Sequence, residues 1–167
     1  MNIFKPLIAS NYQFFETDTL EHLEMLQNRN YKDISLINFS IASVDREFLG
    51  DITIIDSSLL FAFSSRAKEA FKNDGRFISI DSLKCYSLFE PPVIDALDFD
   101  NSLIDYFSGT QKLKRIRKYM FLQEKIGANL SFVLPFKGSP MFVTEKFIAK
   151  YNKLGYNGLD FQLIAEC

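Results

Sequence analysis

The chain has 167 residues, 47% of them hydrophobic, which predicts one globular domain over residues 1–167 with a sizeable core. The composition includes 18 phenylalanines and no tryptophan, so phenylalanine must supply most of the aromatic packing. The net charge of −2 gives no reason to expect nucleic acid or an anionic membrane as partner, and no apolar run approaches the roughly 20 residues that span a bilayer.

The first residues, Met1–Pro6, carry no apolar run long enough for a signal peptide and no small-residue cleavage site follows. The two cysteines, Cys85 and Cys167, are too few for a disulfide framework. We therefore expect a cytoplasmic protein with reduced thiols and no membrane partner.

The N-terminal third predicts several strands around one helix. β-Branched and aromatic residues favour strands near Ile3–Ile8, Tyr12–Phe15, Ile34–Phe39 and Ile52–Ile55.

The expected helix covers about residues 18–28. Asp18 can cap it with Glu21 at the third helical position, and the apolar stripe includes Leu20, Leu23 and Leu26. His22, the single histidine, lies in this helix with no nucleophile motif beside it, which favours an ordinary helix residue over a general base.

One short pattern occurs twice, at residues 60–80 and 141–164. Each copy predicts a strand, a hydroxyl N-cap, a short helix, a glycine stop and a second strand. The caps are Ser64 and Thr144, and the stops are Gly75 and Gly155, where a left-handed conformation can end the helix. The helix faces are Ala67, Ala70 and Phe71 in the first copy and Phe147, Ile148, Tyr151 and Leu154 in the second.

Between and after the copies we expect a strand at about Cys85–Phe89, a break at Pro91-Pro92 and a hairpin. The hairpin strands are predicted at Arg117–Leu122 and Leu130–Leu134, joined by a loop that contains Gly127. Strands and helices do not alternate regularly. We therefore predict an α+β fold with a mixed or mainly antiparallel sheet, a few short helices and two similar strand-helix-strand units.

The sequence offers little that indicates catalysis. Neither a phosphate-binding glycine loop nor a nucleophile elbow is present, and Ser64-Ser65 at a strand-to-helix turn is better explained by capping. One histidine and two distant cysteines do not suit zinc. The aspartates between residues 95 and 105 lack the EF-hand spacing. We expect a protein that is no enzyme and needs no cofactor or metal.

Two charged stretches are candidate binding surfaces. Five basic residues between Lys112 and Lys118 precede Tyr119, which could bind phosphates and stack on a base. Alternation along a strand, however, separates the lysines from Arg115 and Arg117. The second stretch has no lysine or arginine between residues 85 and 111, and its acidic residues could hold a basic partner: Glu90, Asp95, Asp98, Asp100 and Asp105. A polar loop around the Pro-Pro break remains the alternative there.

Four stretches in this order resemble a family of bacterial immunity proteins from polymorphic toxin systems. They are Phe61–Ala67, Val93–Asp98 with Ser102, Met120–Ile126, and Met141–Phe147 with Gly158–Phe161. The resemblance covers roughly residues 45–165. That family usually has a serine where this chain has Thr144, and either residue can cap a helix.

The resemblance implies a small cytoplasmic protein that protects its producer by binding a cognate toxin domain encoded nearby and occluding its active site. It supplies no catalytic residues and does not locate the toxin-binding face. If the toxin acts on nucleic acid, the acidic stretch would mimic the substrate in a basic cleft. The alternative function is a small nucleic-acid-binding or regulatory module that uses residues 112–119.

Overall fold

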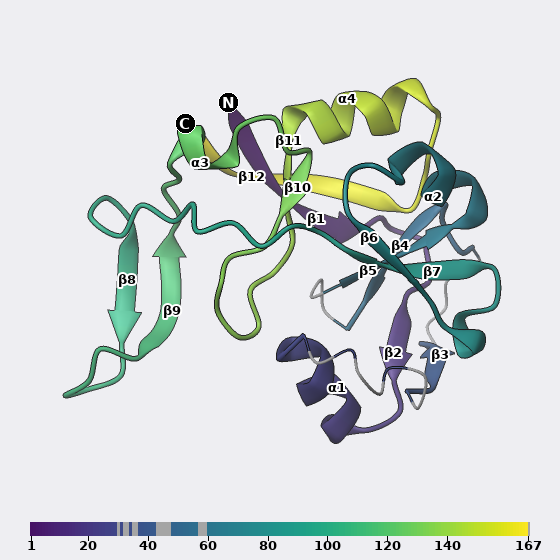
Figure 1. The fold of residues 1–167 in the computed structure, drawn as a ribbon, viewed down its shortest axis with the longest axis horizontal. Coiled ribbons are helices and arrows are strands. Elements are labelled where there is room, and N and C mark those ends of the chain that lie inside the picture. Colours follow the sequence, from purple (N-terminus) through teal and green to yellow (C-terminus); the bar gives the residue numbers. More distant parts are fainter. Residues whose placement is uncertain (30, 32–33, 35–36, 43–47, 57–59, 167) are drawn as a thin grey trace.

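The computed structural model describes residues 1–29, 31, 34, 37–42, 48–56 and 60–166 (Figure 1). Their elements confirm the predicted α+β class. The α-helices are α1 (Leu20–Gln27), α2 (Ser65–Phe71), α3 (Gln123–Ile126) and α4 (Glu145–Lys153), with a 3-10 turn η2 (Asp81–Leu83). The strands are β1 (Asn2–Ile8), β2 (Phe15–Thr17), β3 (Phe39–Ile41), β4 (Ile52–Ile55), β5 (Leu60–Ser64), β6 (Arg76–Ser79), β7 (Tyr86–Glu90), β8 (Leu103–Tyr106), β9 (Leu113–Lys118), β10 (Ser131–Phe132), β11 (Phe142–Thr144) and β12 (Leu159–Glu166).

The described strands form three sheets. One has the order β10-β11-β1-β12, a second has the order β3-β2-β4-β5-β7-β6, and β8 pairs with β9 alone. Pairing between the strands named above is antiparallel except between β2 and β4, where Phe15 lies opposite Ile55 in a parallel pair. The sheets are therefore mixed but mainly antiparallel, as predicted.

The two sequence copies build the same topology. Strands β5 and β6 are joined through α2, and both are antiparallel to β7, which lies between them. Strands β11 and β12 are joined through α4, and both are antiparallel to β1, which lies between them. Each copy is thus a split strand-helix-strand unit, with a third strand inserted in the middle.

The two units share one hydrophobic core. Phe71 at the end of α2 meets Phe147 on α4 with ring centroids 5.0 Å apart. The ammonium group of Lys150 lies 4.4 Å from the Phe71 ring centroid and 2.6 Å from the Asp74 carboxylate. Further buried residues from both larger sheets, from the two helices and from the connecting segments complete this core: Ile52, Ile54, Phe61, Phe63, Ala67, Phe89, Val133, Met141, Val143, Tyr151, Tyr156 and Leu159.

Of the two predicted helix N-caps, only Ser64 forms the expected hydrogen bond. The Ser64 hydroxyl accepts a hydrogen bond from the amide of Ala67 at 3.3 Å, as expected. Thr144 does not cap α4; its buried hydroxyl donates to the carbonyl of Leu130 at 3.2 Å, because β11 packs beside that segment. Helix α4 therefore begins without a side-chain cap.

The glycine stops also differ. Gly155 has φ +64°, as a left-handed helix end requires, whereas Gly75 is not in the left-handed region. A Cβ at Gly75 would lie 2.5 Å from the Phe89 ring. This glycine is thus needed for close packing, and the prediction of a left-handed stop there was wrong.

Helix α1 begins later than predicted. Thr19, not Asp18, accepts the hydrogen bond from the amide of His22, at 3.1 Å. Asp18 instead contacts the ring of His22, and Leu20 is 81% exposed because it faces away from the core. Of the strand expected at residues 34–39, the structure has only the start of β3 at Phe39, and residues 35–36 lie outside the described part of the chain.

The predicted hairpin at residues 117–134 was wrong. Strand β9 pairs with β8, the strand that precedes it in the chain, in an antiparallel register with Ile104 opposite Ile116. The segment expected as the loop contains helix α3, which is followed by Gly127 at φ +59°. Strand β10 pairs with β11, the next strand in the chain. Burial of Phe121 and Ile126 in a second part of the core explains why this segment turns inward.

No helix in the described residues is both long and apolar enough to cross a membrane. Cys85 is an exposed free cysteine, and Cys167 lies outside the described residues.

Candidate interaction surface

The five acidic candidates do not gather at one place. They follow a long connection that leaves β7 and crosses the molecule to β8, on the far left of Figure 1. Glu90 ends β7, Asp105 lies in β8, and the other three lie between them. Their neighbours decide how much negative charge each presents to a partner.

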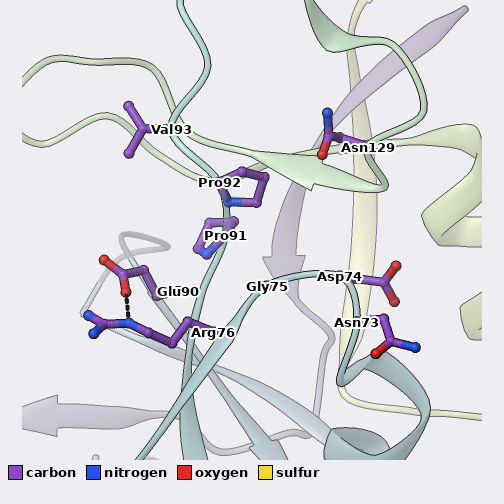
Figure 2. A pocket seen from close by; sticks show the side chains of 9 residues that line it. All are labelled: Asn73, Asp74, Gly75, Arg76, Glu90, Pro91, Pro92, Val93 and Asn129. Atoms are coloured by element: carbon purple, nitrogen blue, oxygen red, sulfur yellow. Dashed lines mark hydrogen bonds and ion pairs between the residues drawn. The ribbon is translucent and has the colours of Figure 1, made fainter.

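Glu90 is neutralised by an arginine on the adjacent strand. Arg76 lies opposite it in the β6–β7 pair and donates from Nε at 2.5 Å. Figure 2 shows this pair beside Pro91 and Pro92, in a hollow of about 470 Å³. Asp74, on another wall, points away from the pair and binds Lys150. Both carboxylates of the hollow are therefore already paired with cations.

Asp98 accepts hydrogen bonds from the backbone of the turn that follows it. Its carboxylate accepts hydrogen bonds from the amides of Asp100 and Asn101 and, at 2.7 Å, from the Asn101 side chain. The hydrogen bond from Asn101 holds the pKa of Asp98 below its ordinary value. This aspartate therefore stabilises the turn that leads into β8.

Asp105 is held by two arginines of β9. Arg115 Nε and the Arg117 guanidinium each lie 2.7 Å from one of its oxygens. The hydrogen bond from Arg115 and the charge of Arg117 lower the pKa of Asp105. The predicted alternation is confirmed here, because both arginines lie on one face of the strand.

Acidification is expected to loosen the β8–β9 pair. Because the folded pKa of Asp105 lies below its ordinary value of 3.8, its ion pairs act fully above that value and are lost as the pH falls through the folded pKa. Amide hydrogen exchange of residues 103–118 between about pH 5 and 2 would measure this change. The Asp105→Asn variant should exchange faster at the top of this range and show a weaker pH dependence. Identical profiles for both proteins would contradict the prediction.

Asp95 and Asp100 are the two candidates that stay exposed and make no ion pair with another described residue. The amide of Asp100 contributes to the Asp98 turn, but its carboxylate has no such role. A basic partner would find these two carboxylates more available than the other three.

The basic stretch is also divided by its contacts. Lys112, Lys114 and Lys118 are exposed and form no ion pair with any residue that the structure describes. Tyr119, expected as a stacking platform, is instead half-buried against Phe121 and Phe142, with centroids 5.7 and 5.1 Å away. It packs on the edge of the core, which leaves less of its ring for a base to stack on.

Sequence reasoning missed an exposed apolar cluster on the same hairpin. Four of the ten exposed large hydrophobic side chains of the described chain fall within residues 99–107: Phe99 at 52%, Leu103 at 55%, Tyr106 at 47% and Phe107 at 51%. Phe99 and Tyr106 line a hollow of about 460 Å³ together with Thr110 and Gln111. Aromatic residues directly before Ser108-Gly109, a turn sequence, were the available signal.

We call the β8–β9 hairpin with its preceding turn, residues 98–118, the arm. It extends to the left of the rest of the molecule in Figure 1. Its base is fixed because Ser102 Oγ accepts from the Met120 amide at 3.0 Å, and Ile104 and Ile116 pack on the core. Its tip is fixed because the Phe107 amide donates to the Lys112 carbonyl at 3.0 Å. The arm thus presents its side chains from an ordered backbone.

The single histidine pairs with a neighbouring carboxylate. His22 Nδ1 lies 2.5 Å from Asp18 on the exposed side of α1, and this pairing lowers the pKa of Asp18. In the part of the chain that the structure describes, no three histidine, cysteine or acidic side chains are grouped to hold a metal ion.

Comparison of the sequence with models of known protein families finds no match, and a comparison with curated proteins finds none either. The stretches that carry the resemblance to immunity proteins are structural in this molecule. Phe61–Ala67 runs from β5 into α2 with most side chains buried, and the 93–98 stretch pairs with residues 120–122 through Leu97 opposite Phe121. They build the core and the base of the arm.

Proposed function

We propose that this chain is a cytoplasmic immunity protein that binds a cognate bacterial toxin domain and neutralises it by occluding its active site. The observation that carries the proposal is the arm, an ordered two-stranded projection with four half-exposed apolar side chains. Several exposed apolar side chains within nine residues, two of them lining one hollow, are typical of a surface that binds another protein.

The structure adds a physical reason for inhibition by occlusion. A projecting hairpin can enter a cleft on a partner. The two split units behind it are then large enough to block access of a substrate to that cleft. An interface of ordinary size, about 1,600 Å² in total, would need the arm and part of the adjacent body. Such an interface blocks an active site without any chemical step by this chain.

The acidic stretch remains a second form of the same proposal. Glu90, Asp98 and Asp105 are bound to internal partners, so mimicry of a nucleic acid would depend mainly on Asp95 and Asp100. Two separate carboxylates make a weaker substrate mimic than five would.

The alternative function, binding of nucleic acid, is favoured by one observation: Lys112, Lys114 and Lys118 are exposed and form no ion pair in the described residues. Packing of Tyr119 against Phe121 covers part of the ring that was expected to stack on a base. Steep loss of oligonucleotide binding with salt would support this alternative.

Co-expression tests the proposal. The probe is the C-terminal domain encoded by the reading frame beside this gene, produced from an inducible promoter in a bacterial host. We expect induction to arrest growth, the present chain to restore it, and the two purified proteins to form a stable complex. A toxic domain that this chain neither binds nor counteracts would refute the proposal.

A further inference from the structure

The arm combines apolar and positively charged side chains. Its aromatic hollow, between Phe99 and Tyr106, is large enough to receive a side chain of a partner. Lys112 directly follows Gln111 of the hollow, and Lys114 lies two residues further along. A partner seated on the tip would therefore meet an apolar centre with lysines on the β9 side and the exposed Asp100 beside Phe99.

We infer that the arm docks an acidic protein surface that inserts an apolar side chain into the hollow between Phe99 and Tyr106. This inference rests on the proposed function, and it assigns the contact to a particular surface and the partner face to a particular chemistry. The toxin domain should carry aspartates or glutamates around one exposed apolar residue.

Charge complementarity argues for an acidic face. Between residues 98 and 118 the arm has five basic and three acidic residues. Two of the basic residues, Arg115 and Arg117, already share Asp105. The three lysines have no ion-pair partner in the described residues, so they can steer an acidic surface and hold it at the rim of the contact.

A protein fits the arm better than a nucleic acid does. The guanidinium groups of Arg115 and Arg117, which suit phosphate geometry best, are occupied by Asp105. Apolar anchors surrounded by a charged rim are the usual anatomy of a protein–protein contact.

Two double variants test the two parts of the inference separately. Tyr106→Ser with Phe107→Ser removes the apolar centre, and Lys112→Glu with Lys114→Glu reverses the charge of two of the lysines. Because all four side chains are exposed, each variant should melt at about the same temperature as the wild type. The probe is again the purified C-terminal domain of the adjacent reading frame, with affinity measured by calorimetry.

Each double variant is expected to weaken binding about tenfold or more, as hot-spot residues do. Added salt should weaken the wild-type complex and have less effect on the lysine variant. Leu20→Ser removes an exposed leucine from α1, away from the arm in Figure 1, and should bind like the wild type. Asp95→Lys with Asp100→Lys should bind as well as the wild type or better.

The outcomes separate this inference from the proposed function. If the wild type does not bind the toxin domain, the proposed function fails and the inference fails with it. If the wild type binds but both arm variants bind equally well, only the inference is overturned. Loss of binding in the Asp95→Lys, Asp100→Lys variant alone would assign the contact to the acidic stretch. Binding of a single-stranded oligonucleotide that the lysine variant loses would assign the arm to nucleic acid.

Discussion

Replacement of Phe71 by alanine is expected to destabilise the protein by about 3–5 kcal/mol, the usual range for a fully buried phenylalanine. The ring stands between the two split units, 5.4 Å from Phe63 in one and 5.0 Å from Phe147 in the other. Its loss leaves a cavity at their junction and removes the aromatic face over which Lys150 lies. Urea unfolding followed by circular dichroism measures the change.

Phe107→Ala is the matched control for this prediction. It makes the same chemical change on the exposed tip of the arm, where the side chain is half-accessible. We expect a loss of less than about 1 kcal/mol, because little apolar surface returns to water. Equal destabilisation by the two variants would mean that the junction at Phe71 is not a main source of stability.

The two split units could be predicted from sequence because their signals are local. A hydroxyl before each helix, an apolar face at helical spacing and a glycine after it all lie within about 20 residues. Which strand lies between the outer two could not be predicted. In one unit it is β7, which follows directly, and in the other it is β1, from the opposite end of the chain.

The hairpin at residues 117–134 was predicted wrongly because the sequence did not determine the strand partner. Strand β9 has possible partners before and after it, and the sequence pattern did not distinguish them. The choice depends on contacts that appear only after folding: Asp105 opposite Arg115, and Ile104 opposite Ile116 against the core. The helix at Gln123–Ile126 is short enough to be mistaken for a loop.

The candidate site was predicted only in part, because the sequence does not show which side chains become neighbours. A run of acidic residues is visible in the sequence, but the cation beside each carboxylate is not. Arg76, fourteen residues before Glu90, and Arg115, ten residues after Asp105, remove much of the expected negative surface. The apolar cluster was missed because Phe99 and Tyr106 fit a core pattern equally well until burial is known.

A methyl group at Gly158 is expected to be among the most damaging small changes in this chain. Gly158 has φ +107°, and a Cβ there would lie 2.3 Å from the carbonyl oxygen of Ile52 and 2.9 Å from Cα of Gly50. Both contacts are with backbone, which cannot rotate away as a side chain can. We expect Gly158→Ala to cost about 3 kcal/mol or more, from backbone strain together with overpacking.

Gly155→Ala separates these two causes. Gly155 also has a positive φ, +64°, but a Cβ there would have no heavy atom within 4 Å. This variant should carry the strain of a left-handed alanine alone, about 1 kcal/mol. Thermal unfolding of the two variants should therefore differ clearly, with Gly158→Ala melting at the lower temperature. The backbone of Gly158, just before β12, lies close to the backbone of Ile52 at the start of β4. Equal melting temperatures would show that the stability of the two larger sheets does not depend on this close approach.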